Sequence, residues 1–382
     1  MRRHFGFLIM TALLAGTAAC STAGATTSLR AATPATQAAP KPEQVDVLSA
    51  SFISTSTGWL LAEPGCARQP NPCKATVLMR KTENGGRTWF TVPAPPAPPA
   101  DAYQSAPPPK SVGRILFTSR SDGWAVGVSL WRTTNGGATW RRVPVPGPLS
   151  EFAVAGSHLL AAVLRCPKDG QCALKAYATT TGQDVWRPVP GATLSQFDPS
   201  AFAVAGSTGY LLANREGTTR AVLLAGPVTG AARWKPLPVP CRAGWTGALA
   251  AAGGWLFLGC ANEPGAGNQL KSAYVSRDGG RTWHQVASPP DGGYLQSASM
   301  TAGGTVFLSG QRMNVYISRD RGRSWHQSPS LAAANGQANA GFSLTGTAVT
   351  NTFGVAVQAG LFSQQVWLTR NAGRTWTPVT VH

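Results

Sequence analysis

Short apolar runs alternate with turn-forming residues along most of the chain, and the clearest example is the stretch 274–286, which reads Y-V-S-R-D-G-G-R-T-W-H-Q-V. Two apolar runs flank Asp278, Gly279 and Gly280, an order typical of a β-hairpin with a tight turn. The Asp278 carboxylate can accept hydrogen bonds from nearby backbone N–H groups, and the two glycines can adopt positive φ without a Cβ clash. Trp283 offers a large apolar side chain for burial. We therefore predict a hairpin whose residues serve conformation rather than chemistry.

The same polar pattern recurs before other tryptophans. Counting back from each Trp, Ser or Thr lies at position −7, Asp or Asn at −5, Gly at −3, and Ser or Thr at −1. The five full copies contain Asn84 and Trp89, Asn135 and Trp140, Asp278 and Trp283, Asp320 and Trp325, and Asn371 and Trp376. Two weaker copies end at Trp186 and Trp234, so that seven tryptophans follow one another at intervals of about 40 to 50 residues. We assign these Asp, Asn and Trp side chains a structural role in the turns.

The pattern resembles the Asp-box repeat, also called the BNR repeat, which implies a hairpin in every unit. A second feature has the same period, because a small residue leads an apolar run in each unit, as in G-W-L-L-A at Gly58 and G-W-A-V-G at Gly123. Each unit then contains four strand-like runs, and four-stranded units repeated around an axis form a β-propeller. We predict an all-β fold, a seven-bladed β-propeller of four-stranded blades, with each box Trp buried between neighbouring blades.

The first residues have the features of a targeting segment. Residues 1–20 combine basic residues with an apolar run at Phe5–Leu14 that is too short to span a bilayer, so we predict a signal peptide. Its end, T-A-A-C, resembles a bacterial lipobox and implies lipidation of Cys20. The alternative is cleavage after Ala25 and release of a soluble protein. We expect the protein on the outer face of the cell membrane as a lipoprotein, or secreted.

Composition divides the remaining chain. Residues 21–44 are rich in Ala, Thr, Ser, Gln and Pro and are predicted to form a disordered tether, whereas residues 45–382 form the propeller. Three insertions interrupt the repeat, at 94–110, Asn262–Lys271 and Ser330–Gly341. In a four-stranded blade these positions fall in loops opposite to the Asp-box turns. Variable loops on a rigid scaffold commonly bind partners, so we expect binding on that face.

The cysteines support export. Besides Cys20, six cysteines fall into the close pairs Cys66 and Cys73, Cys166 and Cys172, and Cys241 and Cys260. Fifteen pairings are possible in principle, and the propeller arrangement favours these three, because each pair brackets a loop or lies across a hairpin of one blade. A metal site is the competing interpretation, but no pair has C-x-x-C spacing and the five histidines are scattered. We predict three disulfides in an oxidising compartment and no metal.

Positive charge is the second global feature, with a formal net charge of +18. It favours acidic partners such as an acidic polymer or an anionic lipid surface, and export argues against nucleic acid. The arginines within the boxes are expected to be solvated rim charges. The candidate binding residues on or beside the insertion-bearing loops are Arg68, Arg165, Lys168, Lys271 and Tyr103.

Asp boxes are also frequent in sialidases and other propeller glycosidases, which makes an exported glycoside hydrolase the alternative function. Such an enzyme needs two carboxylates facing one sugar, or a tyrosine nucleophile with an acidic partner. Outside the boxes, the more plausible acids are Asp46, Asp101, Asp122, Glu151, Asp198, Glu216, Glu263 and Asp291. The Arg-Ile-Pro motif of sialidases has its nearest counterpart at Gly113–Leu116, which lacks the proline. The sequence favours a non-catalytic protein without a cofactor.

A narrower resemblance covers nearly the whole propeller region. The combination of G-W-A-V-G at Gly123 with R-T-T-N-G-G-A-T-W ending at Trp140 is similar to repeats of photosystem II assembly- and stability-factor-like propellers. That resemblance implies a non-catalytic, exported or lumenal propeller that binds a membrane-protein client. We therefore expect an envelope-anchored propeller that binds, or assists the assembly of, an acidic or membrane-associated partner such as an envelope protein.

Overall fold

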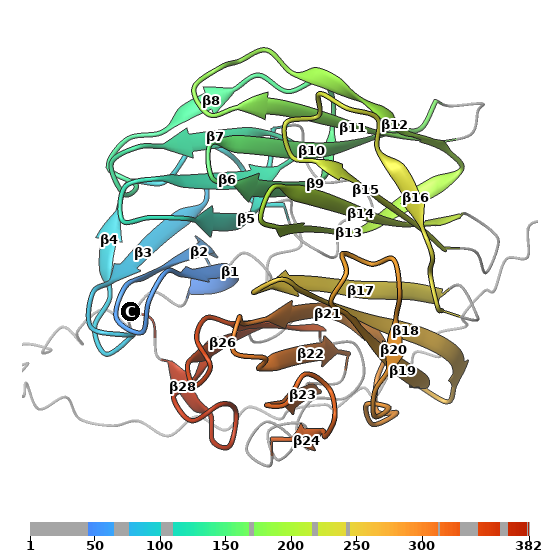
Figure 1. Ribbon diagram of the computed structural model, residues 1–382. Coiled ribbons are helices and arrows are strands. Elements are labelled where there is room, and N and C mark those ends of the chain that lie inside the picture. The colour runs from blue at the N-terminus through green and yellow to red at the C-terminus, as the bar shows by residue number, and fades with distance from the viewer. Residues whose placement is uncertain are drawn as a thin grey trace, which may run out of the picture. The chain divides into compact units, whose positions relative to one another are not determined.

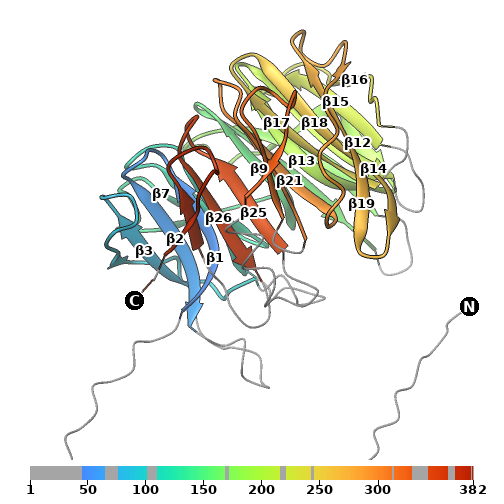
Figure 2. The same ribbon diagram turned by 90° about the horizontal axis from the view of Figure 1, so that it is seen from below.

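The computed structural model describes residues 45–64, 76–100, 110–167, 172–215, 221–241, 245–311, 314–328, 343–359, 366–379 and 381. Over these residues the regular secondary structure consists of β-strands only, in seven four-stranded sheets. Figures 1 and 2 show the sheets as blades around a common axis, so the predicted seven-bladed β-propeller is confirmed. The predicted signal peptide and tether lie outside the described residues. Within the described residues, no helix is long and apolar enough to cross a membrane.

Each blade consists of four antiparallel strands that are consecutive in the chain. Blade 1 contains β1 (Val45–Phe52), β2 (Gly58–Pro64), β3 (Leu78–Thr82) and β4 (Phe90–Val92). Blade 2 contains β5 (Val112–Phe117), β6 (Gly123–Gly127), β7 (Leu130–Thr133) and β8 (Arg141–Val143). Blade 3 contains β9 (Leu149–Ala155), β10 (His158–Arg165), β11 (Ala173–Thr180) and β12 (Arg187–Ser195).

The remaining blades repeat this order. Blade 4 contains β13 (Phe197–Ala205), β14 (Thr208–Arg215), β15 (Ala221–Pro227) and β16 (Lys235–Leu237). Blade 5 contains β17 (Trp245–Ala252), β18 (Trp255–Gly265), β19 (Asn268–Ser276) and β20 (His284–Gln285). Blade 6 contains β21 (Leu295–Met300), β22 (Val306–Gly310), β23 (Val315–Ser318) and β24 (His326–Gln327). Blade 7 contains β25 (Ser343–Ala348), β26 (Gly354–Ala359), β27 (Val366–Thr369) and β28 (Thr377–Val379).

The first strand of each blade lies nearest the axis, where the first strands of most neighbouring blades contact one another (Figure 1). Small hydroxyl side chains connect them. Ser51 Oγ on β1 accepts a hydrogen bond from the backbone N of Phe117 on β5 at 2.9 Å. Ser299 Oγ on β21 likewise accepts one from the backbone N of Ala348 on β25 at 2.8 Å. Small residues are needed here because the blades taper toward the axis.

Apolar side chains fill the interfaces between blades rather than one central core. Seven clusters of buried side chains occur among the described residues, and each draws its members from two neighbouring blades. Between blades 1 and 2, for example, Trp59 stacks on Phe117 with ring centroids 3.9 Å apart and planes inclined by 1°. A sheet that is apolar on both faces must be covered on both, and a closed ring of blades meets that requirement.

Blades 1 and 7 close the ring by packing, because each is built from its own four consecutive strands. Phe52 of blade 1 packs on Phe353 of blade 7 with ring centroids 5.3 Å apart. Across the same seam, Arg370 Nη2 donates a hydrogen bond to Gly85 O at 2.6 Å. Figure 2 shows the blue first sheet beside the red last sheet. The two ends of the repeat array are therefore held by side chains and not by a shared sheet.

The Asp-box turns join the third and fourth strands, as predicted. In blade 5, Asp278 Oδ1 accepts hydrogen bonds from the backbone N of Thr282 at 3.0 Å and from Ser276 Oγ at 2.8 Å. Asp278 Oδ2 accepts one from Thr282 Oγ1 at 2.7 Å, and Ser276 Oγ accepts one from Gly280 N at 2.8 Å. The hydrogen bonds from Thr282 and Ser276 hold the pKa of the Asp278 carboxyl well below its usual range. The hydrogen bonds of this carboxylate therefore all lie within its own turn.

Replacing Asp278 by asparagine should leave stability near pH 7 little changed but make it less sensitive to acid. Asparagine already serves in three boxes. Asn84 Oδ1, for example, accepts from Thr88 N at 3.0 Å, and Asn84 Nδ2 donates to Thr88 Oγ1 at 2.7 Å. The folded-state pKa of Asp278 lies below the unfolded value of about 3.9, so its contribution is present above about pH 4 and is lost as the pH falls through the folded-state pKa. Denaturant unfolding from about pH 7 to about pH 2 should show a steeper loss of stability for the wild type.

The D278A variant is the control, because alanine replaces none of the hydrogen bonds of the Asp278 carboxylate and should lower stability throughout the pH range. Equal acid sensitivity of the wild type and D278N would contradict the role given to the Asp278 carboxylate.

The box tryptophans are buried less uniformly than predicted. Trp234 and Trp376 are buried, whereas Trp89, Trp140, Trp186, Trp283 and Trp325 are half-buried. Four of the half-buried rings donate Nε1 to a carbonyl just after the preceding blade, namely Trp140 to Pro93, Trp186 to Pro144, Trp283 to Pro238 and Trp325 to Ala287, at 2.7 to 3.0 Å. An indole can bury its apolar body while keeping its edge near water, so these residues join blades at the rim.

Candidate functional site

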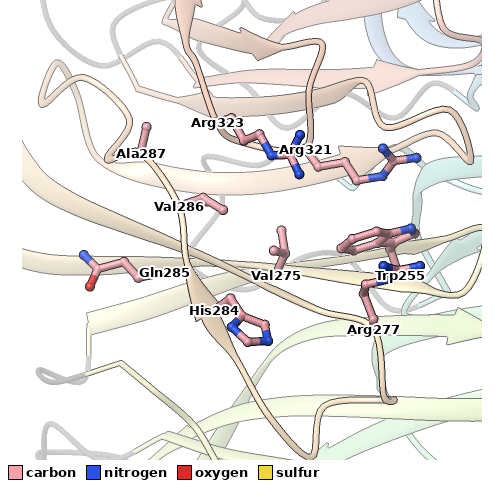
Figure 3. Close-up of a pocket in the computed structure, with 9 residues that line it drawn as sticks. All are labelled: Trp255, Val275, Arg277, His284, Gln285, Val286, Ala287, Arg321 and Arg323. Atoms are coloured by element: carbon pink, nitrogen blue, oxygen red, sulfur yellow. The ribbon is translucent and has the colours of Figure 1, made fainter.

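The face of the ring that carries the Asp-box turns, here called the box face, has hollows between neighbouring blades. The hollow between blades 5 and 6, the 5/6 hollow, has a volume of about 540 Å³. It is lined by Trp255, Val275, Arg277, His284, Gln285, Val286, Ala287, Arg321 and Arg323 (Figure 3). Arg277 stands at position −6 of the blade 5 box, and Arg321 and Arg323 stand at −4 and −2 of the blade 6 box. Two box turns therefore supply its arginines.

Trp255, the first residue of β18, organises two of these arginines. The guanidinium carbon of Arg277 lies 4.7 Å from the centroid of the Trp255 ring, and that of Arg321 lies 4.8 Å from it. Figure 3 shows the indole ring between the two guanidinium groups, one from each blade. Cation–π attraction of about 0.5–1 kcal/mol for each contact at an exposed site offsets part of the repulsion between the two cations. The indole thus holds two guanidinium groups at one place on the box face.

The arginine at position −6 has another role in the next two blades. Arg319 Nη2 of blade 6 donates to Ala372 O of blade 7 at 2.9 Å, and Arg370 Nη2 of blade 7 donates to Gly85 O of blade 1 at 2.6 Å. Each acceptor is position −4 of the following box, so these arginines join neighbouring blades. Arg277 is the equivalent residue of blade 5, and it has no hydrogen-bond or ion-pair partner among the described residues. Its donors are available to a ligand.

Arg321 adopts an unusual backbone conformation at the edge of the same hollow. Its φ is +61°, in the left-handed region, where a residue with a Cβ atom is less stable by roughly 1–2 kcal/mol. Three of the other four full boxes have glycine at this position, namely Gly85, Gly136 and Gly279. Arg321 Nε is buried without a hydrogen-bond partner, and Nη2 reaches only Ala302 O, at 3.5 Å. A strained arginine with an unsatisfied donor marks this hollow as a candidate binding site.

The lining of the 5/6 hollow is cationic. Arg277, Arg321 and Arg323 are its charged members, His284 adds a titratable imidazole, and no carboxylate belongs to the lining. Three like charges in one recess concentrate positive potential there, and guanidinium groups bind carboxylate, phosphate or sulfate oxygens through paired N–H donors. The apolar part of the lining consists of Val275, Val286 and Ala287. The site therefore suits a ligand that combines an anionic group with apolar surface.

None of the residues predicted to bind belongs to the lining of the 5/6 hollow. Arg68, Lys168 and Tyr103 fall outside the described residues, so their role stays a prediction. Arg165 ends β10 on the face opposite the boxes, where it is exposed and donates through Nη2 to the carbonyl of Pro146. The sequence thus suggested none of the residues that line the 5/6 hollow as binding residues.

The prediction that Lys271 is an exposed binding residue is wrong. The predicted insertion at 262–271 is a lengthened hairpin of β18 and β19, and Lys271 is only 4% exposed within it. Its Nζ donates to the carbonyl oxygens of Gln269, Pro290, Gly292 and Gly293 at 2.9 to 3.2 Å. Burial lowers the pKa of the Lys271 ammonium to about 8, against the attraction of Asp291, so the group stays charged at neutral pH. Through these hydrogen bonds, Lys271 on β19 holds the connection between blades 5 and 6 in place.

Two of the three predicted disulfides are present. Cys166 and Cys172 close the connection between β10 and β11, and Cys241 before β17 is joined to Cys260 on β18. Cys20, Cys66 and Cys73 lie outside the described residues. Disulfides persist mainly in oxidising compartments, which is consistent with an exported protein.

Among the acids proposed for a glycosidase, Asp46, Asp122 and Glu151 are buried or paired, whereas Glu263 and Asp291 are exposed. Asp122 pairs with Arg132 at 3.0 Å, and Glu151 lies 3.6 Å from Arg114. Burial raises the pKa of Glu151, against the attraction of Arg114. Asp46 is buried on β1, and Asp101, Glu216 and the Asp198 side chain are not described. In the described part of the chain, no three acidic, histidine or cysteine side chains form a group that could hold a metal ion.

Fold and turn geometry define the chain as a seven-bladed β-propeller with Asp-box turns. The family model described as BNR/Asp-box repeat matches residues 274–285, which form the box hairpin of blade 5. A search of curated proteins finds no match.

Two solved structures of YCF48 share the fold. A structure of YCF48 bound to D1 peptide is 16% identical, with a TM-score of 0.52, and the match covers 89% of this chain and 95% of that chain. YCF48 from Cyanidioschyzon merolae is also 16% identical, with a TM-score of 0.55 and coverage of 87% and 97%. A structure of YjhT is 10% identical, with a TM-score of 0.47 and coverage of 69% and 95%. At 16% identity the likeness to the two YCF48 structures shows the fold alone.

Proposed function

We propose that this propeller is a non-catalytic, exported binding protein that captures an acidic segment of a partner protein in the 5/6 hollow. The observation that carries the proposal is Arg277, which stacks on Trp255 instead of joining the next blade as Arg319 and Arg370 do. An arginine freed from a structural bond and held beside two others is arranged for an anionic ligand.

Two further observations favour a protein partner. The hollow adds apolar side chains to its arginines, which suits a peptide better than an inorganic anion. YCF48, which has the same fold, has been solved with a D1 peptide, so this kind of scaffold can hold a protein segment. In our proposal a lipid on Cys20 anchors the propeller to the cell envelope, where it assists a membrane-associated client. An acidic polymer or lipid surface is the other partner that the formal charge of +18 favours.

The proposal is tested with fluorescent peptides that contain Asp or Glu and with matched peptides that contain Asn or Gln instead. The mature wild-type protein should bind acidic peptides and not their amide counterparts. The double variant with Arg277→Gln and Arg323→Gln should bind about 10- to 100-fold more weakly, because it lacks two charge-assisted contacts at a partly exposed site. Raising the salt concentration should weaken wild-type binding in the same assay.

The matched control is Arg165→Gln, which removes an exposed arginine from the opposite face and should leave binding unchanged. A loss of binding in Arg165→Gln alone would place the partner on the insertion-bearing face and contradict the proposal. Release of sugar from an acidic glycan, abolished by substitution of two facing carboxylates, would instead support the glycosidase alternative. Thermal unfolding of each variant should match the wild type, which separates loss of binding from loss of fold.

A further inference from the structure

A second hollow lies directly beside the 5/6 hollow on the box face. This 4/5 hollow, between blades 4 and 5, has a volume of about 800 Å³. Its polar lining consists of Ser207, Thr208, Tyr210, Lys235, Arg277, Asp278 and Arg281. Arg277 belongs to the lining of both hollows, so the box turn of blade 5 forms a wall that they share.

Blade 4, whose box pattern is weak, supplies one wall of the 4/5 hollow. Trp234 is only 1% exposed, and its Nε1 donates to Pro227 O of its own blade at 3.2 Å, whereas the box tryptophan of blade 5 reaches the preceding blade. The Trp234 indole packs between blades 3 and 4, so it does not line the 4/5 hollow. Gly226 and Pro227 line that hollow beside the apolar Leu237.

The charges of the 4/5 hollow also favour an anionic ligand. Lys235 is exposed and has no hydrogen-bond or ion-pair partner among the residues that the structure describes. Arg281 is exposed as well, and its Nη1 reaches Asp278 O at 3.2 Å. The Asp278 carboxylate is the one negative group of this lining, and its oxygens are already occupied by the turn. Lys235, Arg277 and Arg281 therefore give the hollow an excess of positive charge.

We propose that the two hollows form one track across the blade 5 box turn, and that its ligand is an extended peptide segment with two acidic side chains. One carboxylate is held by Arg321 and Arg323, the other by Lys235 and Arg281, and Arg277 lies between them. This inference rests on the proposed function and adds the length and charge spacing of the segment. Recessed hollows with apolar walls suit a peptide, because lipid headgroups and sulfated sugars offer no apolar side chains to fill them.

The test compares peptides that carry one acidic residue with peptides that carry two, separated by about two to about six residues, each of which spans about 3.3 Å in an extended chain. The wild type should bind the two-acid peptides about five- to tenfold more tightly at one preferred separation, since the second contact is made within the same molecule. Lys235→Gln should remove that preference and leave binding of one-acid peptides unchanged. Arg323→Gln should weaken binding of both kinds.

Arg187→Gln is the matched control, because Arg187 follows Trp186 as Lys235 follows Trp234 but lies outside both hollows. It should behave as the wild type. If Lys235→Gln keeps the full preference for two-acid peptides while Arg323→Gln weakens binding, the track is wrong and the proposed function stands. If no acidic peptide binds, or Arg323→Gln has no effect, the proposed function fails as well. Binding to anionic phospholipid vesicles in place of peptides, abolished by Lys235→Gln, would also overturn the track.

Discussion

Replacing Trp59 by alanine is expected to lower the free energy of unfolding by about 3–5 kcal/mol, the usual cost of removing a fully buried tryptophan side chain. Trp59 has no exposed surface and stacks on Phe117 at a centroid distance of 3.9 Å. Its Nε1 also donates to Gly136 O of blade 2 at 3.0 Å, a carbonyl that the alanine variant leaves without this donor. The substitution therefore removes both apolar packing and a hydrogen bond from one blade interface. Equilibrium unfolding in denaturant measures the loss.

Two companion variants show whether burial decides the size of this effect. Trp59→Phe keeps an aromatic ring against Phe117 and should lose about 1 kcal/mol or slightly more, mainly from the hydrogen bond to Gly136. Trp283→Ala removes a box tryptophan that is only half-buried, so its cost should fall below that of Trp59→Ala. A cost for Trp283→Ala equal to or above that of Trp59→Ala would mean that the box turns, and not the blade interfaces, dominate stability.

Replacing Lys271 by methionine should lower the free energy of unfolding by about 2–3 kcal/mol. The methionine side chain has similar length and more apolar character, yet it cannot donate to the carbonyl oxygens of Gln269 and Gly293, each 2.9 Å from Nζ. Buried carbonyls that lose a charged donor keep the desolvation cost without the hydrogen bond, which typically amounts to about 1–3 kcal/mol. Denaturant unfolding measures this loss of stability. In the variant, amide hydrogens between β20 and β21 should also exchange faster than in the wild type.

Lys235→Met is the control for this prediction, because Lys235 is exposed and should tolerate the change within about 0.5 kcal/mol. A Lys271→Met protein as stable as the Lys235→Met protein would show that water or a rearranged backbone satisfies the carbonyl groups.

The number of blades and the position of each hairpin could be predicted because the Asp-box pattern is local. Ser276, Asp278 and Thr282 satisfy one another within a single turn, and Gly280 supplies the positive φ of +87° that the turn requires. Residue type alone therefore reports the geometry. Repetition at a constant interval then fixes the number of blades, since each unit must cover the apolar face of the next.

The 5/6 hollow could not be predicted in the same way, because the role of an arginine depends on a residue in another blade. Arg277, Arg319 and Arg370 occupy one box position, and only the fold shows that two of them bind a carbonyl while the third stacks on Trp255. One signal was present in the sequence. Arg321 stands where most full copies have glycine, and such an exception to a conformational rule points to a functional site.

The prediction that Lys271 is an exposed binding residue was wrong for a related reason. The polar run around it is typical of an exposed loop, and a lysine there is expected to be solvated. The fold instead brings the backbone of Pro290 and Gly292 to its ammonium group, and backbone carbonyls leave no trace in the residue pattern. A buried charge whose hydrogen-bond partners are backbone atoms of a distant segment is therefore especially hard to predict from the sequence.

The seam between blades 1 and 7 also sets the order in which the chain can fold. Each blade is a local unit of consecutive strands and can form early, whereas the Arg370–Gly85 contact joins residues that are 285 positions apart. The entropic cost of closing a loop grows only with the logarithm of its length, and blades already docked on one another shorten the span that remains. Until that last interface forms, the apolar surfaces around Phe52 and Phe353 stay exposed to water. During that interval the newly made chain is most vulnerable to aggregation and offers a chaperone a surface to hold.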